Sequence, residues 1–155
     1  MPPLDHETLL RRSFTVAERA RGRGNHPFGA ILVNRTGDIL LEVENGYLPE
    51  HGHAERLLAT ATSKQFDPKF LADCTLTARP GRAACAPAPP IGPVSAAWVY
   101  GLSERRLKVI TGNHAENPTL DLPCCSVFAA GQRHVEVIGP LLVDEAAAIH
   151  AEVWD

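Results

Sequence analysis

The order of hydrophobic patterns along the chain restricts its fold more than any other feature. Apolar residues at helical spacing come first, in DHETLLRRSFTVAERARGRG, with Asp5 as the predicted N-cap and Gly22 as the predicted end. Two apolar runs around Gly37 and Asp38 then predict a β-hairpin over residues 28–44. Helical and strand patterns alternate after the hairpin. This order predicts an α/β fold in which helices cover both faces of a mixed sheet.

The alternating part is expected to supply most of the secondary structure. It predicts helices over 52–66, 104–110, 125–131 and 144–154, and strands over 74–78, 96–103 and 134–139. A chain of 155 residues is long enough to bury one sizeable core. We therefore expect residues 1–155 to form a single domain.

Charge and cysteine content narrow the classes of ligand and compartment. A net charge of −3 and a pI near 6.1 give no general attraction to nucleic acid or to anionic membranes, so a small-molecule ligand is expected. The start of the chain lacks the pattern of a signal peptide, and no apolar run approaches the roughly 20 residues of a membrane span. A cytoplasmic protein is expected, and its cysteines, two of which are adjacent, fit reduced thiols better than a disulfide framework.

Histidine and glutamate two residues apart form the first candidate for chemistry. This pair occurs four times, beginning at His53, His114, His134 and His150. His134 and His150 are expected at the surface, and His114 lies in a predicted loop. Only His53, with Glu55, follows the hairpin and opens a helix, where one side chain can bind a metal and the other can act beside it.

Segments spread along the chain carry a family resemblance. HPFGAILV, ENGYLPEHGHAER, TLTA, VYGLSE, TGNHAENPTLDLPC and VFAAGQRHVEVIGPLLVDEAAAIH together resemble the cytidine deaminase superfamily, in the branch with bacterial guanine deaminases and tRNA adenosine deaminases. The resemblance implies a three-layer α/β/α domain with a five-stranded mixed sheet, a homodimer, and one catalytic Zn²⁺ held by the histidine of an H-x-E motif and the two cysteines of a P-C-x-x-C motif.

Site residues follow from matching these motifs position by position. The resemblance implies that His53 is a zinc ligand and that Glu55 is the general acid/base that carries protons between water, ring nitrogen and leaving ammonia. It also implies a substrate-binding wall made of Phe28, Gly29, Ala30 and Asn45.

The stretch ARPGRAACAPAPPIGPVSAAW, residues 78–98, replaces the segment that should supply the other two zinc ligands. In the family's register the two cysteines fall on Ala83 and Ala86, with Cys85 between them as a weak third candidate. Alanine cannot coordinate zinc, and the prolines would break the helix that normally carries these ligands. A back-translation of residues 81–98, read from the third base, gives PCGMCAGATYWSGVGRV, which is the family's segment.

Two histories explain this stretch. A pair of compensating frameshifts spanning roughly residues 79–98 is the leading hypothesis, and a diverged surface loop is the alternative. The predicted function is zinc-dependent hydrolytic deamination of a purine-type, guanine-like base or nucleoside with release of ammonia. The alternative is a catalytically silent relative that binds no zinc tightly and serves as a binding or assembly partner. In the C-terminal tail, Trp154 is expected either to pack or to close over the base.

Overall fold

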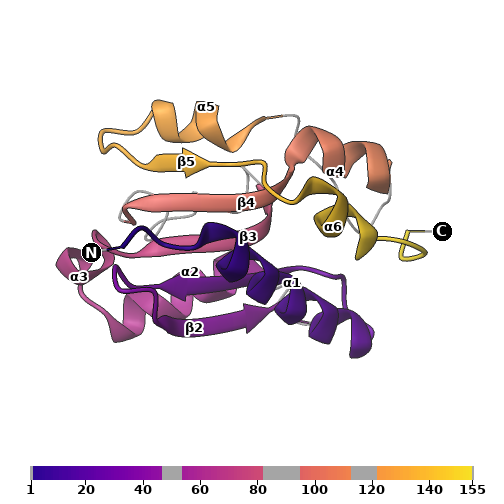
Figure 1. Ribbon diagram of the computed structural model, residues 1–155, viewed down its shortest axis with the longest axis horizontal. Helices are drawn as coiled ribbons and strands as arrows, with labels where there is room; N and C mark the ends of the chain where they lie inside the picture. Colours follow the sequence, from indigo (N-terminus) through magenta and orange to yellow (C-terminus); the bar gives the residue numbers. More distant parts are fainter. Residues whose placement is uncertain (1, 47–53, 82–94, 113–121, 155) are drawn as a thin grey trace.

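Five strands form one mixed sheet in the computed structural model, which describes residues 2–46, 54–81, 95–112 and 122–154 (Figure 1). The strand order is β2-β1-β3-β4-β5, with β1 antiparallel to β2 and β3, and with β3, β4 and β5 parallel. The strands are β1 (Gly29–Val33), β2 (Ile39–Glu44), β3 (Thr75–Gly81), β4 (Ala97–Ser103) and β5 (Glu136–Ile138). The expected five-stranded mixed sheet is confirmed.

Local chemistry explains where the helices begin and end. The Asp5 side chain accepts a hydrogen bond from the Thr8 backbone N–H at 3.0 Å and so caps α1 as predicted. Ser103 caps α4 by accepting from the Arg106 N–H, and Gly112, with φ of 58°, ends it. The helices are α1 (His6–Gly22), α2 (Ala54–Gln65), α3 (Pro68–Leu71), α4 (Glu104–Thr111), α5 (Cys124–Ala129) and α6 (Val143–Ala148).

Alternation along the strands divides the core between two faces of the sheet. Ile31 and Val33 of β1 pack with Leu9 and Val16 of α1 in one buried cluster, and α6 lies on the same face, in front in Figure 1. The alternate β1 residues join the larger cluster, which also contains Leu58 of α2. Helices thus cover both faces of the sheet, which confirms the three-layer expectation.

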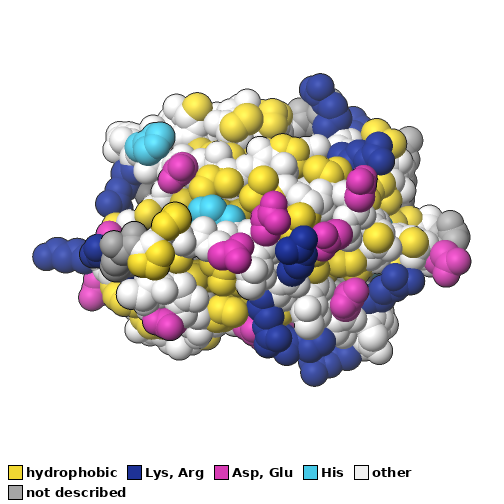
Figure 2. Space-filling view, in the orientation of Figure 1, with side chains coloured by type: hydrophobic (Ala, Val, Ile, Leu, Met, Phe, Trp, Pro, Cys, Tyr) yellow, Lys and Arg dark blue, Asp and Glu magenta, His cyan; other side chains and the backbone are white. Residues whose placement is uncertain are grey.

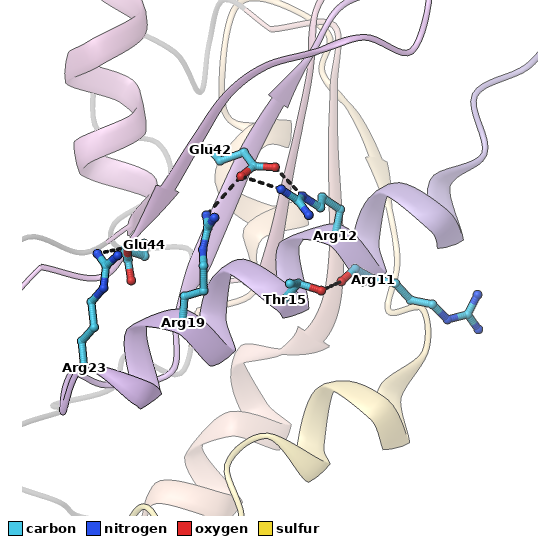
Figure 3. A network of polar contacts seen from close by, with 7 residues as sticks. All are labelled: Arg11, Arg12, Thr15, Arg19, Arg23, Glu42 and Glu44. Atoms are coloured by element: carbon cyan, nitrogen blue, oxygen red, sulfur yellow. Dashed lines mark hydrogen bonds and ion pairs between the residues drawn. The ribbon is translucent and has the colours of Figure 1, made fainter.

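Ion pairs attach α1 to the edge strand β2 (Figure 3). Glu42 of β2 accepts hydrogen bonds from the guanidinium groups of Arg12 and Arg19, and Glu44 accepts one from Arg23. The hydrogen bond from Arg12 is the main cause that lowers the pKa of Glu42 below its usual value of 4.5. Five charged groups, three on α1 and two on β2, therefore hold this helix against the sheet.

Two helices differ from the predictions. The short helix α3 was not predicted, although Asp67 caps it and Pro68 occupies its first turn, a combination that signals a helix start. The last helix was predicted over 144–154, but α6 ends at Ala148. Residues 149–153 form turns, and Glu152 among them has a φ of 60°, which is not a helical conformation.

Within the described parts of the chain, no helix is both long and apolar enough to span a membrane.

Candidate functional site

Phe28 and Asn45 meet at the end of the sheet where β1 begins and β2 and β3 end. The register pairs Gly29 with Glu44 and Ala30 with Ala78, so the residues just outside these pairs become neighbours. The Asn45 N–H donates to the Phe28 carbonyl at 3.0 Å. Phe28 is 1% exposed, Asn45 is 9% exposed, and the Asn45 side-chain oxygen has no hydrogen-bond partner within the described structure.

Gly29 and Ala30, which the resemblance also assigned to the substrate-binding wall, are the first two residues of β1. Both lie in β1 and are buried. A Cβ on Gly29 would lie 2.6 Å from the Ala17 nitrogen and 2.8 Å from the Ser13 carbonyl oxygen, both in the α1 backbone. Glycine is therefore needed here because the helix and the strand approach each other closely, whereas Ala30 faces the opposite side of the sheet.

The helix α2 begins next to this wall. Its first residue, Ala54, is fully buried, and a Cβ on Gly46 would meet the Leu57 side chain at 3.5 Å. Glu55 is the second residue of α2, so its backbone lies at the end of the sheet that carries Asn45. His53 precedes the helix and lies outside the described residues, so its role stays a prediction.

The expected metal centre is not supplied by the described residues. Across residues 2–46, 54–81, 95–112 and 122–154, no three His, Cys, Asp or Glu side chains form a group that could hold a metal ion. Cys85, Ala83 and Ala86 lie outside those ranges. The sequence itself offers one histidine and one cysteine where the motif needs three ligands, so this donor set does not fit a tetrahedral zinc site with one open position.

The strand after the proline-rich stretch contains buried polar atoms that lack partners. Trp98 in β4 is fully buried between Leu76 of β3 and Val137 of β5, and its ring lies 5.8 Å from that of Phe128. Its indole N–H has no hydrogen-bond partner in the described structure, and neither has the buried hydroxyl of Ser95. Most buried polar groups in folded cores have a partner, so these two atoms are exceptions that the described residues do not satisfy.

Two buried groups beside β4 are held in their neutral forms. Burial raises the pKa of Tyr100 to about 12 and that of the Cys124 thiol to about 11, with smaller effects from neighbouring thiols. Cys74 and Cys124 are free and buried, and Cys125 is free and exposed. The thiols among the described residues are therefore reduced, as predicted from the sequence.

The C-terminal residues contribute a group of aromatic rings that the pattern analysis missed. The prediction that His150 lies at the surface is wrong, since it is 2% exposed and its ring lies 5.6 Å from Phe28. Its Nδ1 accepts a hydrogen bond from the Trp154 indole N–H at 3.0 Å. An amphipathic helical pattern over 144–154 could not reveal this, because the chain leaves the helix after Ala148. His134, in contrast, is exposed as predicted.

Comparison with known proteins gives relatives of matching length. A protein of Schizosaccharomyces pombe named as a probable cytosine deaminase is 29% identical over 152 residues, which cover 94% of this chain and 90% of that protein. The structure of a guanine deaminase from Nitrosomonas europaea superposes with a TM-score of 0.74 at 18% identity, covering 98% of this chain and 85% of that one. A structure from work on tRNA:A34 deaminases gives 0.61 at 18% identity, covering 92% and 99%.

At 18% identity the two solved structures show the fold alone. The match to a family model shows which family the chain belongs to. The family described as the cytidine and deoxycytidylate deaminase zinc-binding region matches residues 3–89, which is more than half of the chain and includes α1, the hairpin, α2 and β3. The chain therefore belongs to the cytidine and deoxycytidylate deaminase family, a family of hydrolytic deaminases with a zinc-binding region.

Proposed function

We propose that this protein recognises a purine-type, guanine-like base or nucleoside, and that the reaction of its lineage is hydrolytic deamination with release of ammonia. The observation that carries the proposal is the buried Asn45 side-chain oxygen, which has no partner within the described structure and lies beside Phe28. The reaction type is supported by membership of the deaminase family.

Asn45 and Phe28 have complementary chemistry for a planar base. A buried acceptor without a partner costs about 1–3 kcal/mol, and an N–H on the edge of a purine would remove that cost. The buried Phe28 ring, just before β1, would supply an apolar contact to the base. A site of this kind rejects ligands that lack the matching donor, because the acceptor then stays buried and unpaired.

A small ligand is favoured over a nucleic acid. The net charge is −3, and on the face in Figure 2 the Lys and Arg side chains are interspersed with Asp and Glu. Binding to a phosphate backbone draws on several clustered cationic side chains. The charge distribution therefore supports a free base or nucleoside as the substrate.

Glu55 is the proposed proton carrier. The proposal is supported by its position as the second residue of α2, a helix whose Leu57 side chain lies near Gly46, the residue after Asn45. A carboxylate in this position can take a proton from water and deliver it to a ring nitrogen and then to the leaving amine. Substitution Glu55→Gln would remove this function and keep the size of the side chain.

The incomplete donor set favours a second candidate function for the chain as written. His53 and Cys85 alone make a poor zinc site, and Ala83 and Ala86 add no ligand. A protein with the base-binding wall and no tightly held zinc would bind a base without converting it. We propose that this literal chain behaves so, and that the deaminase activity belongs to a form in which the metal-binding segment is restored.

A replacement chain tests both parts of this proposal. In the replacement chain residues 82–98 are exchanged for PCGMCAGATYWSGVGRV, which puts the two cysteines at positions 83 and 86, and both chains are assayed for ammonia release from guanine, guanosine, adenine and cytosine in the presence of zinc. Calorimetric titration with 8-azaguanine, which occupies a crystal structure of a similar fold, measures base binding independently of turnover.

The two proposed functions, deamination and base binding without conversion, predict different results for the two chains. We expect both chains to bind 8-azaguanine and only the replacement chain to release ammonia, with guanine or guanosine as the best substrate. Failure of both chains to bind 8-azaguanine would contradict the proposed base site. Ammonia release from cytosine alone by the replacement chain would contradict the purine assignment and leave the reaction type standing.

A further inference from the structure

Four aromatic rings lie together just before the start of β1. Phe28 is 5.6 Å from His150 and 6.2 Å from Trp154, measured between ring centroids, and His26 is 4.6 Å from Trp154. Only Phe28 and His26 belong to the start of the sheet, whereas the other two rings come from the last residues of the chain. The surroundings of Phe28 therefore depend on where the C-terminal segment, residues 149–154, is held.

Contacts within residues 149–154 do not fix this segment by themselves, although Ile149 and His150 are buried against the rest of the domain. The helix α6 that precedes it is six residues long, and Glu152 adopts a left-handed conformation, which costs about 1 kcal/mol or more in a residue other than glycine. Terminal segments are poorly ordered unless something attaches them to the body of the domain. Within the segment, the hydrogen bond from Trp154 to His150 fixes the two rings relative to each other.

Arg21 of α1 attaches the segment from outside. Its guanidinium donates from Nη1 to the Ile149 carbonyl at 3.2 Å and from Nη2 to the Ala151 carbonyl at 2.9 Å. These carbonyls follow the C-terminus of α6, where backbone acceptors lack helical partners and a cation is favoured. The two bonded carbonyls flank His150, so the guanidinium fixes the backbone on both sides of the ring that contacts Phe28.

We propose that Arg21 is a positioning residue for the base site. It holds the backbone around His150, this places the His150 and Trp154 rings, and these rings fix the orientation of Phe28. The inference rests on the proposed function, since Phe28 is there assigned to the wall that contacts the base.

Arg11 provides a matched control. Arg11 and Arg21 both lie on α1 and line the same groove between α1 and α6, and both are exposed. Arg11 donates two hydrogen bonds of 3.0 Å to the carboxylate of Glu145 on α6. It therefore links the same two elements but does not touch residues 149–154 in the described structure.

The test compares Arg21→Met with Arg11→Met in the full chain. We expect Arg21→Met to weaken 8-azaguanine binding about tenfold and to increase acrylamide quenching of Trp154, while Trp98 stays protected because it is fully buried. Arg11→Met should bind 8-azaguanine as the parent chain does. Arg21→Lys should recover part of the affinity, because an ammonium group lacks the planar fork that reaches two carbonyls at once.

Three results would overturn the proposal. Parent-like affinity in Arg21→Met at equal thermal stability shows that Arg21 does not act on the base site. Equal loss of affinity in both variants shows a general effect of loosening α1 from α6. Unchanged Trp154 quenching in Arg21→Met shows that the segment is held without Arg21. If the parent chain binds no 8-azaguanine but the quenching changes, the anchoring by Arg21 holds and the proposed function fails instead.

Discussion

Asn45 and Trp98 both bury a polar group without a partner in the described structure, but their surroundings differ. Asn45 lies at the end of the sheet, bonded through its backbone to Phe28 and close to the start of α2. Trp98 lies inside the sheet, with neighbours on both sides and Phe128 against its ring. A ligand at the end of the sheet could satisfy the first group, whereas the second is enclosed by neighbouring strands among the described residues. We therefore interpret Asn45 as a binding contact and Trp98 as a mismatch inherited from the segment before it.

The largest effect is expected from Gly29→Ala, which tests how closely α1 packs against β1 near Asn45. The added methyl group would overlap backbone atoms of α1, so the free energy of unfolding should fall by about 3 kcal/mol in urea denaturation. The control is Gly22→Ala at the last position of α1, where a Cβ meets nothing within 4 Å, and it should leave stability unchanged or raise it slightly. Equal effects at both glycines would refute the close approach of α1 and β1.

Asn45→Ala should separate binding from stability. We expect the affinity for 8-azaguanine to fall about tenfold to a hundredfold, since a hydrogen bond worth about 1–3 kcal/mol is lost from a buried position. Stability of the free protein should stay the same or rise, because a buried acceptor without a partner is removed. Parent-like affinity in this variant would show that Asn45 does not contact the base.

Glu42→Gln should lower the free energy of unfolding at pH 7 by about 1 kcal/mol, because hydrogen bonds to two arginines of α1 lose their charge. The pH dependence of the parent protein's stability follows in part from the lowered pKa of Glu42. The stabilisation is present above pH 4.5, the value in the unfolded chain, and is lost as the pH falls through the folded value.

The variant should therefore approach the parent in stability at low pH. Glu145→Gln, which breaks a more exposed pair with Arg11, is the control and should cost less at pH 7. A difference in the free energy of unfolding between Glu42→Gln and the parent that stays constant from pH 7 to pH 3 would show that the charge of Glu42 contributes nothing to stability.

The smallest effect is expected from Trp98→Phe. This change removes the indole N–H and keeps an aromatic ring, so the gain from losing an unsatisfied donor and the cost of a smaller side chain should nearly cancel. Stability within about 1 kcal/mol of the parent and unchanged 8-azaguanine affinity would support the interpretation of Trp98 as a mismatch. A large loss of stability would show that the indole makes a contact the core depends on.

The sequence predicted the elements whose signals are local. Asp5, Gly22 and the turn at Gly37 and Asp38 marked α1 and the hairpin correctly, because caps and turns are decided by neighbouring residues. The burial of His150 could not be predicted in this way. It depends on a left-handed residue and on contacts with α1 and β1, which are distant in sequence.

The same difference between local signals and long-range contacts applies to the candidate site. The structure places Phe28 and Asn45 side by side, whereas Gly29 and Ala30 of β1 face opposite sides of the sheet, so the wall that the family resemblance implied stays a prediction. The resemblance could not show that Gly29 is required by α1, because that reason lies in packing across the sheet. His53, Cys85 and the Glu55 side chain stay predictions, since they lie outside what the structure describes.

Zinc content measured on the two purified chains tests the central claim most directly. The claim is that this chain keeps the base-binding half of a deaminase site and has lost the metal-binding half. The chain as written should carry far less than one zinc after dialysis, and the chain with PCGMCAGATYWSGVGRV at residues 82–98 should carry about one. About one tightly held zinc in the chain as written would contradict the claim.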